Sequence, residues 1–221
     1  MSGSADESRP DVDALRAAAD TMRAVRERCV WSQRITHRDL VPYLIEESHE
    51  VIDAVESGTR DDLREELGDL LWQVLFHAAI AAQDPDDPFD IDDVAATLTE
   101  KMVRRHPHVF GDEVATTPEE VLIHWNAAKA AEKRTRRSVL DGVPRGMPAL
   151  ALAQKLVGRA AGAGVTVPQS PVAATPASEA ELGDALLALV ATARAEGWDA
   201  ERALRERLRL LEDEVRQAEA G

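Results

Sequence analysis

Cysteine and aromatic residues are scarce in this 221-residue sequence, which contains a single cysteine, Cys29, and only 4% aromatic residues. One cysteine excludes an intrachain disulfide bond and a zinc site built from several cysteines. Long apolar runs are also missing: none approaches the roughly 18 residues of a membrane span, and residues 1–13 lack the apolar core of a secretory signal. We therefore expect a soluble, cytoplasmic protein that does not contact a membrane.

Positively charged residues are also few: the sequence contains 26 Lys and Arg residues but 41 Asp and Glu residues, so its formal net charge is −15. A field of that sign repels polyanions, which excludes a protein that coats a nucleic acid polymer. It suits a protein that binds cations. The hydrophobic fraction of 44% is large enough for a folded core, so the chain is not a disordered acidic segment.

Strand-type alternation of β-branched residues is absent, and Ala, Leu, Glu and Arg dominate instead. These residues favour helices, so the sequence predicts an all-α protein. Local signals mark the helix ends: Pro42 suits a first turn, Gly58 suits a C-terminal stop, and Thr59 with Asp62 resembles a capping box. The predicted helices cover residues 12–28, 42–58, 59–83, 92–105, 118–134, 178–196 and 199–218.

Changes in composition divide the chain into four parts. We expect a flexible tail over residues 1–13, a catalytic domain over 14–157, a flexible linker rich in Gly, Ala and Pro over 158–177, and a second repeat over 178–221. The repeat is predicted because Glu66-Leu67-Gly68-Asp69 recurs as Glu181-Leu182-Gly183-Asp184. No Glu-Glu-x-x-Glu precedes the second copy, which therefore looks degenerate.

Four carboxylates border the apolar stripes of two consecutive predicted helices. Glu47 and Glu50 lie beside the stripe of Leu44, Val51, Ile52 and Val55, and Glu66 and Asp69 lie beside the stripe of Leu63, Leu67, Leu70, Val74 and Ala78. Antiparallel packing would make all four converge, with Gly68 leaving room for close backbone approach. Converging like charges need protons or a cation, and oxygen ligands fit Mg²⁺, with Mn²⁺ a further possibility. The alternative is that these are solvated surface acids.

Residues 104–108 form the only dense basic cluster of the first half, next to Lys101 on the same predicted helix. Beside a metal site, Lys101, Arg104 and Arg105 would bind a polyphosphate. The alternative is that these cations only complement the helix dipole. His106 and His108 are weak zinc candidates because no third histidine or cysteine stands nearby in the sequence. Trp125 and Lys129 share one face of the following helix.

These motifs together resemble the MazG family of nucleoside triphosphate pyrophosphohydrolases. The resemblance covers roughly Leu15 to Gln154 and rests on EExxE at residues 46–50, ExxD at 66–69, Lys101, and the basic block 104–110. It implies a four-helix-bundle fold assembled by dimerisation, with active sites near the subunit interface. It also implies Mg²⁺-dependent hydrolysis of nucleoside triphosphates to the monophosphate and pyrophosphate, as nucleotide-pool housekeeping.

The resemblance implies a role for each matching residue. Glu47, Glu50, Glu66 and Asp69 match the metal-binding acids, Lys101 and Arg105 match cations that contact the triphosphate, and Trp125 and Lys129 match residues near the nucleotide. Glu46 and Glu47 are both expected to be catalytic: one carboxylate of the site takes the proton of the attacking water, and Glu46 either supports the metal ligands or orients that water. Val30 departs from the family pattern, which has a proline at that position and a Gly-rich segment nearby.

Two other functions remain open at this point. A binding or regulatory module could keep the fold without turnover, although the intact acids and cations of the first half favour an enzyme. A di-metal phosphodiesterase usually has histidine ligands, and the helical wheel turns His49 away from the acids.

Overall fold

The computed structural model describes residues 13–132, 138–144, 146–162, 165, 167 and 176–220, with the backbone alone for 211–220. Every regular element within these residues is a helix, which confirms the all-α prediction. None of the described helices is long and apolar enough to cross a lipid bilayer. The chain divides into two compact units, Met1–Lys129 and Ala130–Gly221, and each is described by itself.

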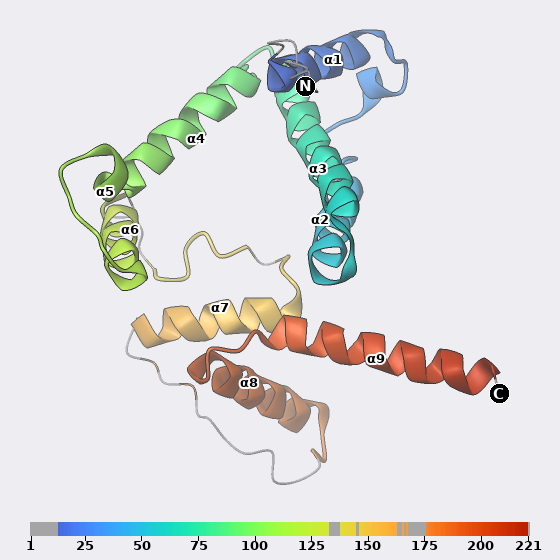
Figure 1. The fold of residues 1–221 in the computed structure, drawn as a ribbon, viewed down its shortest axis with the longest axis vertical. Helices are drawn as coiled ribbons and strands as arrows, with labels where there is room; N and C mark the ends of the chain where they lie inside the picture. The colour runs from blue at the N-terminus through green and yellow to red at the C-terminus, as the bar shows by residue number, and fades with distance from the viewer. Residues whose placement is uncertain are drawn as a thin grey trace, which may run out of the picture. The chain divides into compact units, whose positions relative to one another are not determined.

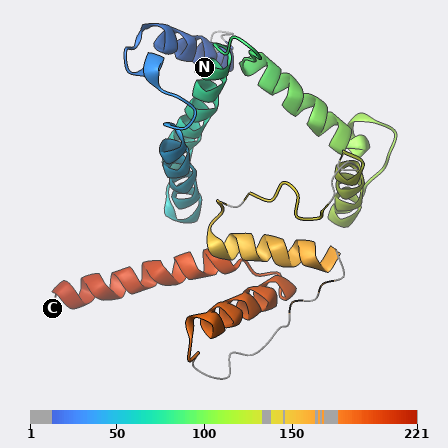
Figure 2. The same cartoon turned by 180° about the vertical axis from the view of Figure 1, so that it is seen from behind.

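The first unit starts with a helical hairpin supported by a third helix. α2 and α3 lie side by side in antiparallel orientation, and α1 packs against α3 (Figures 1 and 2). The helices that begin in this unit are α1 (Ala14–Arg28), η1 (Ser32–Arg34), α2 (Val41–Ser57), α3 (Arg60–Ala81), α4 (Ile91–Arg105), α5 (Pro107–Phe110) and α6 (Pro118–Glu132).

Short-range hydrogen bonds fix the helix ends that the sequence predicted. The Thr59 amide donates to Asp62 Oδ2 at 2.7 Å and the Asp62 amide donates to Thr59 Oγ1 at 3.2 Å, so the capping box at the start of α3 is confirmed. The amides of Thr116 and Thr117 donate to Glu120 Oε2 at the start of α6. The predicted end of that helix at Arg134 lies outside the described residues.

The core of the first unit lies where α1, α3 and the segment before α2 meet. Its fully buried members are Ala19, Met22, Leu40, Leu75 and Phe76. Ala19 and Met22 come from α1, Leu40 precedes α2, and Leu75 and Phe76 come from the C-terminal half of α3, so this core lies at the end of the hairpin away from Glu66.

The predicted apolar stripes of the hairpin are covered only in part. Val51, Ile52, Leu63 and Leu70 are half-buried and Ala78 is buried, whereas Val55 is 65% exposed, Leu67 50% and Val74 40%. Helical periodicity identifies an apolar face but not the neighbour that covers it, and here α1 packs on the side of α3 that buries Leu75 and Phe76. Both views show α4 leading away from the hairpin (Figures 1 and 2).

Gly68 also differs from expectation. A Cβ added at Gly68 would meet no atom within 4 Å, so no close backbone approach occurs there within the part of the chain that the structure describes. At Gly58, by contrast, a Cβ would lie 2.8 Å from Ala54 Cα. The glycine that a close approach requires is therefore the one that ends α2.

The second unit consists of α7 (Ala149–Gly162), α8 (Glu179–Ala195) and α9 (Ala200–Ala220), with α7 packed against both others. The sequence did not predict α7, and because α7 continues to Gly162 the linker cannot begin at Gly158. A Cβ at Gly158 would lie 2.7 Å from the Arg194 guanidinium of α8, so this glycine belongs to a helix contact. Residues 1–12 of the predicted tail, with Pro168 and Pro171 of the linker, lie outside the described residues.

Buried positions match between α8 and α3. α8 buries Ala188, Val190, Ala191 and Ala193, which are the positions that correspond, in the predicted repeat, to the buried Gln73, Leu75, Phe76 and Ala78 of α3. α7 packs on α8, and α1 packs on α3. Between α7 and α8, the described residues contain no counterpart of α2, the helix that carries Glu47. The degenerate second repeat stays a prediction.

Candidate active site

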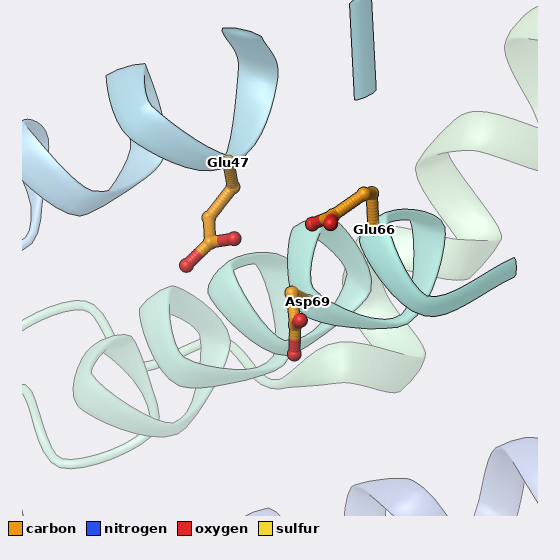
Figure 3. A group of neighbouring side chains, drawn as sticks. All are labelled: Glu47, Glu66 and Asp69. Atoms are coloured by element: carbon orange, nitrogen blue, oxygen red, sulfur yellow. The ribbon is translucent and has the colours of Figure 1, made fainter. Parts of the chain in front are cut away.

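Three of the four predicted metal-binding acids converge in the hairpin. Glu47 projects from α2, and Glu66 and Asp69 project from successive turns of α3 (Figure 3). One carboxylate oxygen from each lies within 4.8 Å of the others. Glu47 and Glu66 are half-buried and Asp69 is exposed. The antiparallel packing of the two helices brings Glu47 to two acids that lie 19 and 22 residues further along the chain.

Glu50 lies beside this group, one helical turn after Glu47, although it is outside the 4.8 Å cluster. Its carboxyl group forms a hydrogen bond with that of Glu47, and its charge acts on Glu66. A side chain on an exposed helical turn needs only a rotamer change to approach its neighbour. The structure therefore places Glu50 at the edge of the cluster and the other three acids within it.

The electrostatics of the cluster are those of acids held together without compensation. Desolvation raises the pKa of Glu47, and the hydrogen bond to Glu50 and the charge of Asp69 raise it further. Desolvation also raises the pKa of Glu66, followed by the charges of Glu50 and Asp69. Among the described residues, no cation contributes to either shift. The oxygen-only donor set fits a hard divalent cation, which would relieve this repulsion.

The sequence analysis did not identify Gln73, which touches the cluster from α3. Gln73 is 5% exposed, lies one turn after Asp69, and donates from Nε2 to Glu47 Oε1 at 3.4 Å. Its buried Oε1 accepts no hydrogen bond within the described part of the chain. The signal that could have revealed it is the polar spacing Glu66, Asp69, Gln73, which extends the acidic edge of α3 by one turn.

Glu46 and His49 lie outside the cluster. Glu46 is exposed on α2. His49 Nδ1 lies 2.7 Å from the Ile45 carbonyl of its own helix, which sets that nitrogen as the donor. The helical wheel placed both residues toward the wet side of α2, and their exposure in the structure agrees with that placement.

The predicted substrate-binding residues form a second group at the end of α4 and on α6. The Arg105 guanidinium lies 5.0 Å from the centroid of the Trp125 ring, and His106 contacts the same ring edge-on at 5.2 Å. Lys101 and Arg104 belong to the last turns of α4, and Lys129 follows Trp125 by one turn of α6. Because α4 leads away from the hairpin, this group and the acids occupy different ends of the first unit (Figure 1).

A third histidine lies near His108 in space, although none is close in the sequence. The rings of His108 and His124 stack with their centroids 5.9 Å apart. The acidic cluster is the only group of three or more metal-type ligand atoms within 4.8 Å among the described residues, so the histidines do not form such a group. His106 contacts both His108 and Trp125, so the four rings form a chain of aromatic contacts.

Comparison with known proteins places this site in a family. Residues 35–110 match the MazG nucleotide pyrophosphohydrolase domain. The chain is 46% identical to the "Uncharacterized 26.1 kDa protein in blaB 3'region" of Streptomyces cacaoi, over 99% of this chain and 93% of that protein. It is 35% identical to the nucleoside triphosphate pyrophosphohydrolase of Escherichia coli K12, over 94% of this chain and 87% of that protein.

A third relative matches a shorter stretch. The nucleoside triphosphate pyrophosphohydrolase of Mycobacterium tuberculosis is 51% identical over 67% of this chain, and the match spans 45% of that protein. The match of the family domain includes Glu47, Glu66 and Asp69, and the two longer matches extend over nearly the whole chain. The chain therefore belongs to the MazG family.

Proposed function

We propose that this protein hydrolyses nucleoside triphosphates to the nucleoside monophosphate and pyrophosphate, with Mg²⁺ held by Glu47, Glu50, Glu66 and Asp69. Mn²⁺ suits the same oxygen ligands. The observation that carries this proposal is the convergence of uncompensated acids from two helices, in a chain whose relatives are named nucleoside triphosphate pyrophosphohydrolases. We assign the activity to nucleotide-pool housekeeping in the cytoplasm, where these substrates are used.

The residues of the chain divide the chemistry between them. A divalent cation held by the four acids would neutralise phosphate charge and acidify a nearby water. Glu47 takes the proton of the water that attacks the α-phosphorus, and Glu46 orients that water from the solvent side. The bond from the α-phosphorus to its bridging oxygen breaks, and pyrophosphate leaves. Lys101, Arg104 and Arg105 bind the triphosphate, while Trp125 and Lys129 contact the nucleoside.

Pyrophosphate release from a panel of nucleoside triphosphates tests this function, with Mg²⁺, Mn²⁺ or a chelator. We expect metal-dependent release by the parent and a loss of about 10²-fold or more in kcat for Glu47→Gln, since that change removes both a ligand and the proton acceptor. Glu65→Gln is the matched control, because Glu65 is an exposed acid next to Glu66 on α3. Absence of metal-dependent release with every nucleotide would support the binding-module alternative instead.

We also propose that the active form is a homodimer. A groove of about 370 Å³ lies along α1, α3 and α4 and is lined by apolar side chains that include Leu71, Val74, Val94 and Leu98. Leu98 is 50% exposed. Apolar surface of this kind favours a partner. A second copy would cover it and could place substrate-binding cations beside acids that lie at the other end of the unit.

The homodimer proposal predicts that Leu98→Glu dissociates the protein. A carboxylate in an apolar contact carries a large desolvation penalty, so we expect a monomer with at least tenfold lower kcat/KM. Thr97→Glu adds the same charge at the neighbouring exposed position and serves as control. Analytical ultracentrifugation measures the mass of each variant. A parent that sediments as a monomer at full activity would contradict the proposal.

A further inference from the structure

α1 contains a buried arginine whose charge has no acidic partner. Arg26 is only 7% exposed. Its Nε donates to Gln83 Oε1 at 3.0 Å, and its Nη1 donates to the carbonyl oxygens of Ser32 and Ile35. All three acceptors are neutral, and within the described residues no carboxylate forms an ion pair with Arg26.

The second terminal nitrogen of this guanidinium is unused. Nη2 carries two N–H donors, and it donates no hydrogen bond to the part of the chain that the structure describes. Burial lowers the pKa of Arg26. Its Nη2 itself is accessible to solvent, unlike the buried and unpartnered Oε1 of Gln73, so an anion can reach its donors.

A cavity of about 250 Å³ lies next to this side chain, between α1, the C-terminal half of α3 and the first residues of α4. Water occupies about 30 Å³ per molecule in the liquid, so the cavity is far larger than one bound water requires. Seven of its lining residues are apolar, namely Ala19, Met22, Leu75, Ala78, Ala79, Ala82 and Ile91. Its polar lining residues are Arg23, Arg26, Glu27, Gln83 and Asp90.

We propose that this cavity binds a small organic monoanion, a carboxylate on an apolar body, with the carboxylate accepting from Arg26 Nη2. The apolar residues would contact the body of the ligand. Arg23 lines the cavity too, but it is paired with Asp20 at 3.0 Å, so Glu27 and Asp90 would repel a second negative charge on the ligand. This disfavours a phosphate dianion. The cavity shares no residue with the carboxylate cluster of Glu47, Glu66 and Asp69, so the site is separate from the proposed catalytic site.

A ligand in this cavity would also stabilise the backbone of the segment before α2. The other donors of Arg26 hold the carbonyl oxygens of Ser32 and Ile35, so a ligand that fixes the guanidinium restrains these contacts too. We therefore expect the amide hydrogen of Ile35, which donates to the Ser32 carbonyl at 3.3 Å, to exchange more slowly with ligand bound.

Calorimetric titration of the full chain with benzoate, without metal or nucleotide, tests the proposal. Benzamide is the neutral probe of the same shape, and we expect benzoate to bind the parent at least tenfold more tightly, since hydrogen bonds to charged groups are the stronger ones. Ala79→Leu fills the cavity and keeps Arg26, and it should abolish binding. Arg26→Gln should weaken benzoate binding at least tenfold. The control Arg64→Gln removes an exposed arginine of α3, away from the cavity, and should leave benzoate binding unchanged.

Each remaining outcome overturns the proposal. Equal affinity for benzoate and benzamide would mean that the charge is not recognised, and unchanged binding to Ala79→Leu would place the ligand elsewhere. Tighter binding of phenyl phosphate than of benzoate would refute the choice of a monoanion. If Arg26→Gln does not fold, Ala79→Leu decides alone. Because the titration uses no nucleotide, its result does not depend on pyrophosphohydrolase activity.

Discussion

Gln73 on α3 donates a hydrogen bond to Glu47 on α2, so it links the two helices at the carboxylate cluster. We predict that Gln73→Leu raises the Mg²⁺ concentration for half-maximal turnover by about tenfold, the effect typical of residues that orient metal ligands. Stability should change by no more than about 1 kcal/mol, since leucine fits the volume and the unpartnered Oε1 is removed. The measurement is turnover against Mg²⁺, with urea unfolding beside it.

Gln33→Leu provides the control for this change. Gln33 donates its side-chain amide to the Glu27 carbonyl at the protein surface, far in the chain from the acids. Its replacement should leave the metal dependence unaltered. A Gln73→Leu protein with the metal dependence of the parent would show that Glu47 needs no support from α3.

The buried side chain of His77 makes the stability of the protein depend on pH. Its Nδ1 lies 2.8 Å from His37 Nδ1, with the rings 4° from parallel, and its Nε2 is buried without a partner among the described residues. Burial, followed by the charge of His37, lowers the pKa of His77 below its usual value of 6.5. Below pH 6.5 the unfolded chain therefore binds more protons than the folded chain, so stability falls with falling pH.

We predict that the free energy of unfolding, measured in urea from pH 7.5 to 5.5, falls less steeply with decreasing pH for His77→Phe than for the parent. His49→Phe is the control, because His49 is exposed. The raised pKa values of Glu47 and Glu66 act in the opposite direction in this window, so the difference between variants is the informative quantity. If the free energy of unfolding falls equally steeply with pH in the parent and in His77→Phe, His77 is not the cause of the pH dependence.

At the scale of helices, the helix ends could be predicted from the sequence, but the packing between helices could not. The capping hydrogen bonds at Thr59 and Glu120 join residues three or four apart, so the sequence contains all the information that they need. α7 was missed although Ala and Leu dominate its first half and favour a helix. Its glycines, Gly158 and Gly162, resemble those of the following Gly- and Pro-rich segment, and its packing against α8 and α9 could not be read from the sequence.

The same division applies to the candidate site. Glu47, Glu66 and Asp69 could be placed together because both helices carry their acids one turn apart and consecutive helices joined by a short turn pack antiparallel. Gln73 was missed because a buried amide looks like any polar residue in a sequence. The contact of His108 with His124 spans a loop, and no periodic pattern reports such a contact.

Replacing Gly68 or Gly58 of the hairpin with alanine should change the stability of the protein in opposite directions. Gly68→Ala should stabilise the protein by about 0.5–1 kcal/mol, since the site is open and alanine is the better helix former. Gly58→Ala should destabilise it by about 1–3 kcal/mol, since its Cβ would overlap Ala54. Thermal unfolding of both variants measures the two signs. Destabilisation by Gly68→Ala would mean that a partner subunit approaches this turn closely.

At the scale of the whole chain, the predicted repeat would leave the second unit without a counterpart of α2 among the described residues. Glu181 corresponds to Glu66, yet its Oε2 accepts a hydrogen bond from the Ala177 amide at 2.7 Å, and its own amide donates to Ser178 Oγ. This carboxylate is thus engaged in capping α8. Asp184 corresponds to Asp69 and is exposed. Two acids on one helix offer too few ligands to hold a hard cation against water.

We predict that the double variant Glu181→Ala, Asp184→Ala keeps the kcat and the Mg²⁺ dependence of the parent. It should lose about 0.5–1 kcal/mol of stability in the second unit, because the cap of α8 is weakened. The matched double variant Glu66→Ala, Asp69→Ala removes the corresponding acids of α3 and should lose at least about 10²-fold in kcat, as expected when two metal ligands are deleted. Pyrophosphate release and thermal unfolding of the three proteins separate these effects. Loss of metal-dependent turnover on changing Glu181 and Asp184 would mean that the second unit contributes to a working site.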